Sequence, residues 1–479
     1  MALGQVDFGL YSVVGGMIAF LKLIDNLLST AISRFYGVSV GMALREPENG
    51  IEECRKWFTT AVIVQTVLPV ILVVVGYPIG EWVVREFLTI PPDRVEACVW
   101  VWRYVCLSCF VVMFSMPFRA MYTAKQEIAE LTIYSFATTT LTAFFLYYIV
   151  THPGVWLATY AFWMCMMSVI PQVIICINAV VRYRECRFRF AYVNCWSRIR
   201  QLTAYAGWQS FGCLGGILRA QGLAILVNKY FGPTVNAAVS IGSGVSSHCN
   251  TLATCLVGAF SPAIMNAYGA GRMDEMRRFA YWTCKIGTLL MLVFSIPLAL
   301  EIDEVLLLWL KNPPRYAAGL SLCVLAMMVI DRTAVGHMLA VNARGKIALY
   351  QAVLGGSLIC TLPIAWILIV SGVGVYAIGW AMIVTMMACA WGRVWFARRL
   401  VGMSARYWLR FILLPLCALT AVSLGVGCLP RLFLAPSFVR VCMTTCVVEI
   451  CLLPSAWYLI LSPAERASVL EKVRRKIGK

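Results

Sequence analysis

Stretches of about 20 apolar residues recur from one end of this 479-residue chain to the other. Each is long enough to cross roughly 30 Å of hydrocarbon as one helix. Only 13% of the residues are charged, about half the fraction of an ordinary soluble protein. We therefore expect an all-α multi-pass membrane protein. The pattern predicts thirteen spans, at residues 10–34, 57–80, 98–118, 128–150, 155–180, 203–227, 235–262, 280–302, 317–341, 347–371, 375–397, 406–427 and 435–461.

The gaps between these spans alternate in charge. One set contains about 26 Lys and Arg and the other about 6. Because Lys and Arg concentrate in cytoplasmic loops, the basic set and the C-terminus are predicted to lie on the cytoplasmic side of the inner (plasma) membrane. The net charge of +18 therefore indicates topology and contact with anionic lipids at that face, and not nucleic-acid binding. A capping-box pattern, Ser462-Pro463-Ala464-Glu465, predicts a helix at the start of the basic tail 462–479.

A short motif occurs twice, as Ala124-Lys125-Gln126-Glu127-Ile128-Ala129 and as Ala343-Arg344-Gly345-Lys346-Ile347-Ala348, 343 − 124 = 219 residues later. Six predicted spans separate the copies, so both have the same orientation. This predicts two lobes of six helices, related by a pseudo-twofold axis along the membrane normal, with the substrate site between them. The predicted division is an N-terminal lobe 1–180, a basic inter-lobe segment 181–202, a C-terminal lobe 203–397, two extra spans in 398–461 and the tail. The first lobe is one helix short, and we expect a further span before Met1.

Several segments resemble bacterial polysaccharide flippases of the multidrug/oligosaccharidyl-lipid/polysaccharide exporter superfamily, over nearly the whole chain. They are Leu3-Gly4-Gln5-Val6-Asp7-Phe8-Gly9-Leu10-Tyr11-Ser12-Val13-Val14-Gly15-Gly16, Ser33-Arg34-Phe35, Leu226-Val227-Asn228-Lys229-Tyr230-Phe231-Gly232-Pro233, Tyr268-Gly269-Ala270-Gly271, Leu308-Trp309-Leu310 and Asn342-Ala343-Arg344-Gly345-Lys346-Ile347.

The resemblance implies alternating-access export of a lipid-linked oligosaccharide, with undecaprenyl-diphosphate-linked oligosaccharide as the partner, for surface polysaccharide biosynthesis. It implies a transporter and not an enzyme, and we expect a monomer. The sequence departs from the family in lacking the first helix. The 20 Cys lie mostly inside apolar stretches, so we expect neither a disulfide framework nor a cofactor. A coupling ion, proton or sodium, cannot be assigned from the residues.

Ionisable residues inside spans are costly and usually face a wet cavity. Lys22 and Asp25 are three residues apart and share one helix face near the membrane midplane. They are either a cavity-lining pair, which binds an anionic substrate or responds to a proton, or an internal ion pair that allows both charges to be buried.

Four arginines and one further acid complete the candidate substrate-binding set. Arg219 has no acid within a helical turn, and its guanidinium suits a diphosphate or an acidic sugar unless it extends to the outer surface. Arg34 and Arg119 lie at inner span ends and either guide a diphosphate or anchor helices. Asp331 and Arg332 are adjacent, about 100° apart on a helix, and need not pair.

Two other functions remain open. A cation-coupled multidrug exporter of the same superfamily would need unpaired acids in its first lobe, where Asp25 is the one deep candidate. A membrane glycan polymerase or ligase typically has a long outer loop with catalytic residues, whereas the outer gaps here are short.

Overall fold

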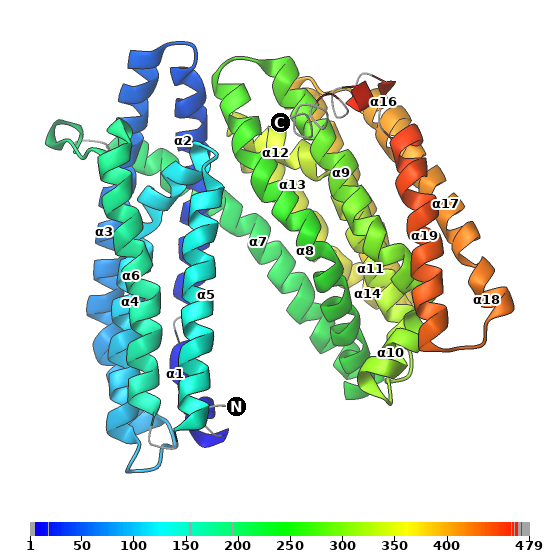
Figure 1. The fold of residues 1–479 in the computed structure, drawn as a ribbon, viewed down its shortest axis with the longest axis horizontal. Helices are drawn as coiled ribbons and strands as arrows, with labels where there is room; N and C mark the ends of the chain where they lie inside the picture. The colour runs from blue at the N-terminus through cyan, green and yellow to red at the C-terminus, as the bar shows by residue number, and fades with distance from the viewer. Residues whose placement is uncertain are drawn as a thin grey trace. The chain divides into compact units, whose positions relative to one another are not determined.

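The computed structural model describes residues 5–17, 19–152, 156–193, 196–460, 462–463, 465–467 and 471, and all regular secondary structure within them is helical. The chain divides into two compact units (Figure 1). Unit 1 contains Met1–Gly207 and Met265–Arg272, and unit 2 contains Trp208–Ile264 and Met273–Lys479. The prediction of an all-α protein built as two helical bundles is confirmed.

The helices up to Arg182 belong to unit 1. They are α1 (Gln5–Gly16), α2 (Ala19–Ala43), α3 (Pro47–Trp82) with its π-helical continuation η1 (Val83–Phe87), α4 (Val95–Ala124), α5 (Ile128–Thr151) and α6 (Leu157–Arg182). Two short 3-10 turns, η2 (Arg184–Cys186) and η3 (Phe190–Tyr192), follow before α7 (Trp196–Phe231), inside which the chain passes into unit 2.

The remaining helices follow along the chain. They are α8 (Pro233–Gly269), α9 (Met273–Leu300), α10 (Ile302–Leu310), α11 (Ala317–Thr333), α12 (Val335–Arg344), α13 (Ala348–Ile359), α14 (Thr361–Val370), α15 (Ala377–Val401), α16 (Ala405–Trp408), η4 (Leu409–Leu413), α17 (Leu414–Gly427), α18 (Leu429–Phe433) and α19 (Phe438–Leu459).

Eleven helices among the described residues are long and apolar enough to cross a membrane, and the bent pair α11 and α12 makes a twelfth. The chain is therefore a multi-pass membrane protein. The predicted continuous span 10–34 is wrong, because α1 ends at Gly16 and α2 begins at Ala19. The consecutive glycines Gly15 and Gly16 are poor helix formers and favour an interruption there.

The predicted span 317–341 also breaks, with a bend of 45° between α11 and α12. The break removes the carbonyl of Thr333 from the helical ladder, and the indole N–H of Trp408 donates to it at 2.9 Å. At the start of α12, Gly336 contacts the backbone of α9 so closely that an added Cβ would lie 1.8 Å from the carbonyl oxygen of Ala280. The bend is thus stabilised by a replacement hydrogen bond and by close packing.

The core of unit 1 lies where α1, η1, α4 and α6 meet. Trp102 of α4 is buried, and its indole N–H donates to the carbonyl of Tyr77 at 3.1 Å. Gly80 makes room for this ring, since an added Cβ would lie 2.1 Å from it. Figure 1 shows the α2–α3 turn, the α4–α5 turn and the α6–α7 segment at one end of this unit. The basic gaps of the first half therefore share one end, as the charge pattern predicts.

The core of unit 2 packs α9 against α15, α17 and α19. A buried ion cluster joins the end of α9 to α19. The Glu301 carboxylate, 1% exposed, accepts hydrogen bonds from Arg440 at 2.8 Å and from Thr444 at 2.9 Å. This cluster fixes the C-terminal helices to the rest of the unit.

The repeated motif forms the same turn in both units. Gln126 joins α4 to α5 with φ of 63°, and Gly345, 219 residues later, joins α12 to α13 with φ of 85°. The two turns occupy corresponding positions in the repeated motif, and each has a residue with positive φ. This similarity supports the internal duplication.

The capping box at the start of the tail is confirmed. The amide of Ser462 donates to Glu465 at 2.7 Å, and the amide of Glu465 donates to the Ser462 hydroxyl at 3.3 Å. Glu465 also pairs at 3.0 Å with Lys285, which is 2% exposed. Burial raises the pKa of Glu465, but the hydrogen bonds from Ser462 and Lys285 outweigh it and hold that pKa below its usual value. Residues 472–479 of the predicted basic tail lie outside the described residues.

The turn between α7 and α8 allows a clean test of backbone strain. Gly232 has φ of 80° and nothing within 4 Å of an added Cβ, whereas Gly244 has equal space but a helical backbone. We expect Gly232→Ala to destabilise the protein by about 1 kcal/mol, because a Cβ is strained at positive φ. Gly244→Ala should be neutral or slightly stabilising. Thermal unfolding of the two detergent-solubilised variants measures the difference, and equal behaviour would contradict the strain argument.

Candidate functional site

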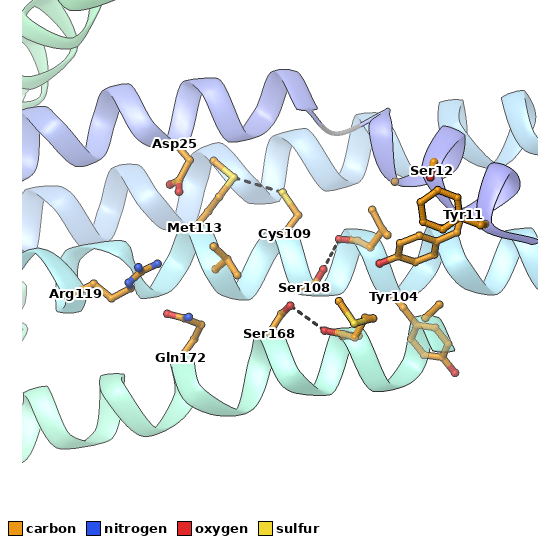
Figure 2. Close-up of a pocket in the computed structure, with 17 residues that line it drawn as sticks. Tyr11, Ser12, Asp25, Tyr104, Ser108, Cys109, Met113, Arg119, Ser168 and Gln172 are labelled. Atoms are coloured by element: carbon orange, nitrogen blue, oxygen red, sulfur yellow. Dashed lines mark hydrogen bonds between the residues drawn. The ribbon is translucent and has the colours of Figure 1, made fainter. Parts of the chain in front are cut away.

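A cavity of about 660 Å³ lies inside unit 1, between α1, α2, α4 and α6 (Figure 2). Its lining is mixed, with hydroxyl, thiol, amide and aromatic groups among apolar side chains. Polar and aromatic members include Tyr11, Ser12, Tyr104, Ser108, Cys109, Ser168 and Gln172. A cavity of this size and character can hold part of an amphiphilic ligand.

Two charged side chains, Asp25 from α2 and Arg119 from α4, complete the cavity wall, and Figure 2 shows both pointing into the same space. Asp25 is 6% exposed and accepts a hydrogen bond from Gln65 at 3.2 Å. Arg119 attracts the Asp25 carboxylate electrostatically, yet the two form no ion pair. Within the described part of the chain no side chain bonds to the Arg119 guanidinium, so its fork of five donors remains open.

Arg119 also borders a second, smaller pocket of about 60 Å³ lined by α5 and α6. Tyr134 there accepts a hydrogen bond from the Asn178 amide at 2.8 Å, so its own hydroxyl proton stays available. Gln172 accepts one from Ser115 at 2.9 Å, which leaves its amide N–H groups available. The guanidinium, a phenol and an amide thus form a cluster of donors. Such a cluster suits an anion with several oxygen atoms.

Unit 2 contains a buried cluster of charged side chains, in which several arginines surround one aspartate. Asp331 pairs with Arg332 at 2.8 Å and with Arg393 at 2.8 Å. The Arg393 guanidinium also donates to the Asp331 carbonyl at 3.2 Å. Arg219 lies within electrostatic reach of Asp331 and contacts the Met327 sulfur at 3.5 Å. Three arginines against one aspartate leave a net charge of +2.

Unit 2 also contains an apolar groove of about 450 Å³ between α9, α11 and α17. Leucine, isoleucine, valine and alanine dominate its lining, with a few hydroxyl groups such as Thr288 and Thr420. Its surface suits a hydrocarbon chain and not a sugar.

The structure brings the sequence-predicted residues together in two groups. Asp25 and Arg119 share the unit 1 cavity, and Asp331, Arg332 and Arg219 share the unit 2 cluster. Adjacent residues on a helix need not form an ion pair, but Asp331 and Arg332 form one.

Two other sequence-predicted residues are not in these groups. The Arg34 guanidinium stacks on Phe35 at 4.6 Å and on Tyr205 at 5.2 Å, which favours the helix-anchoring alternative. The Lys22 side chain lies outside the described residues, so its pairing with Asp25 stays a prediction.

Sequence reasoning missed Gln65, Gln172 and Arg393. All three are polar residues within predicted spans. The free-energy cost of placing a polar side chain inside the membrane was the signal that could have identified them. The sequence does not indicate which neighbouring helix each of these three side chains faces.

Solved structures of MATE transporters have the same fold as this chain. A MATE in complex with MaL6 has a TM-score of 0.64 at 14% identity, covering 84% of this chain and 91% of that one. An outward-facing multidrug resistance MATE family transporter of the MOP superfamily has a TM-score of 0.66 at 12% identity, with coverages of 84% and 89%. A MOP superfamily transporter from Pyrococcus furiosus, whose binding pocket is described as having reverse polarity, has a TM-score of 0.63 at 12% identity, with coverages of 84% and 92%. No family model and no curated protein matches the sequence.

Proposed function

We propose that this chain exports an undecaprenyl-diphosphate-linked oligosaccharide across the cell inner membrane by alternating access. The observation that carries the proposal is the Arg119 guanidinium, which faces the unit 1 cavity and has no ion-pair partner among the described residues. An unpaired cation facing an internal cavity is costly unless a ligand or water satisfies it. A diphosphate is the group that a guanidinium fork binds best.

The surrounding chemistry of unit 1 supports a ligand with two different polar parts. Arg119, Tyr134 and Gln172 offer donors to the diphosphate. The hydroxyl and aromatic groups of the cavity wall suit a glycan, which needs hydrogen bonds and flat apolar faces.

A ligand or ion can bias the transport cycle only if it binds the two access states with different affinity. Asp25 is a buried carboxyl on the cavity wall, so a proton or a sodium ion at Asp25 could provide such a bias. The chain is proposed to act as a monomer and as a transporter without catalytic chemistry.

One observation favours the alternative function, a cation-coupled multidrug exporter. Asp25 and the tyrosines of the cavity could bind an aromatic cation, and one structural neighbour is named a multidrug resistance transporter. Arg119 in the same cavity opposes this, because a like charge repels a cationic ligand.

Reconstitution tests the proposal. Purified protein in liposomes that contain a fluorescent undecaprenyl-diphosphate oligosaccharide should move it between leaflets at least tenfold faster than protein-free liposomes do. A membrane-impermeant reagent that destroys the exposed label measures the movement. Equal rates with and without protein, together with active export of a cationic dye, would overturn the proposal.

A further inference from the structure

The segment between α6 and α7 is fixed to unit 1 at both of its ends. At the first, Glu185 pairs with Lys125 at 2.6 Å and Cys186 is 1% exposed. At the second, the Lys56 ammonium lies 5.7 Å from the ring of Tyr192. Residues 187–191 therefore form a short loop between two attachment points.

Basic and aromatic residues alternate along this loop. Arg187 and Arg189 have extended backbones, with φ, ψ of −98°, 113° and −127°, 121°, so neighbouring side chains point to opposite faces. Phe188 and Phe190 accordingly share a face, and their rings lie 5.2 Å apart. Phe190 is 86% exposed. Among the described residues no carboxylate lies within ion-pair distance of Arg187 or Arg189, although Glu52, which pairs with Lys56 at 2.8 Å, lies within electrostatic reach of Arg189. The loop thus presents two exposed arginines and an aromatic pair to its surroundings.

The loop directly follows an exposed apolar face of α6. The exposed apolar face of α6 includes Ile177 and Val180 and ends at Val181, which is 78% exposed. Arg182 follows directly and ends the helix. Figure 1 shows the segment after α6 projecting sideways from unit 1, and not away along the helix axis. Where the exposed apolar face of α6 contacts lipid, a sideways projection directly after it would bring the loop to the membrane surface.

We propose that the loop 187–191 binds the headgroups of anionic phospholipids, with Phe188 and Phe190 inserted into the interface. Phe side chains insert at the boundary between headgroups and acyl chains, and each Arg near an anionic surface strengthens association by about fivefold. The role is independent of the transported substrate. It holds the loop, and with it the ends of α6 and α7 in unit 1, on the anionic leaflet.

Hydrogen exchange in nanodiscs tests this proposal on the full-length protein. The amides of residues 187–191 donate no backbone hydrogen bond within the described structure, so they exchange fast unless an external surface covers them. Exchange of these amides should be about tenfold slower in nanodiscs with one-third phosphatidylglycerol than in pure phosphatidylcholine, and high salt should remove much of the difference.

Matched variants separate the attraction of the arginines to anionic headgroups from the insertion of the phenylalanine rings. Arg187→Gln with Arg189→Gln should abolish the dependence on anionic lipid, and Phe190→Ser should weaken protection in both lipids. Arg45→Gln, an exposed arginine on the α2–α3 turn, should change nothing at the loop. All variants should keep their thermal stability, since the changed side chains are exposed. Equal exchange in both lipids, or an effect of Arg45→Gln as large as that of the double variant, would overturn the proposal.

Discussion

Replacing Asp331 with asparagine should destabilise the protein by about 3–5 kcal/mol. The Asp331 carboxylate pairs with both Arg332 and Arg393, whose side chains are both only 13% exposed. Removing one partner of a buried ion cluster leaves uncompensated charge in a region of low dielectric. Unfolding of the purified protein in detergent, by heat or by denaturing detergent, measures the loss.

Two further variants establish the cause. Asp303→Asn changes an exposed aspartate at the start of α10 and should alter stability by no more than about 0.5 kcal/mol. The triple change Asp331→Leu, Arg332→Leu and Arg393→Met removes all three charges and should recover much of the loss. If Asp331→Asn is as stable as the parent chain, the cluster does not hold unit 2 together.

Replacing Arg119 with glutamine should reduce transport of a diphosphate-linked oligosaccharide by about 10- to 100-fold. The reason is the loss of a charge-assisted, forked contact to the diphosphate, which the neutral amide of glutamine cannot replace. Arg119→Lys keeps the charge but loses the fork, and should restore part of the rate. The initial rate of leaflet exchange in liposomes is the measurement.

Arg103→Gln is the matched control, on the same helix. Its guanidinium is already engaged, with a hydrogen bond to the Tyr77 hydroxyl at 3.1 Å and Glu81 at 3.7 Å. Its replacement should leave transport within about twofold of the parent rate. A folded Arg119→Gln protein with parental transport would remove the main support for the proposed substrate.

The helical class, the number of bundles and the repeated turn were predictable, because they depend on hydrophobic length and on internal similarity. The turn at Gln126 and Gly345 is the clearest case, since the sequence motif itself repeats. The interruptions were harder to predict. The break between α11 and α12 depends on a hydrogen bond from Trp408, 75 residues after Thr333, which no local pattern indicates.

Some residues of the candidate site could be selected from the sequence, but their arrangement could not. The cost of burying charge identified Asp25 and Arg119, which lie 94 residues apart on different helices. Their common cavity depends on how α1, α2, α4 and α6 pack, and that packing is set by tertiary contacts. The same holds for Arg393, whose partner Asp331 is on another helix.

Direct binding measurements show whether the unit 1 cavity receives an anion. Purified full-length protein is titrated with a short-chain polyprenyl diphosphate and, separately, with a lipophilic cationic dye. We expect the diphosphate to bind, Arg119→Gln to weaken this binding at least tenfold, and Asp25→Asn not to weaken it. Tight binding of the cationic dye that is abolished by Asp25→Asn would contradict the account and favour a multidrug exporter.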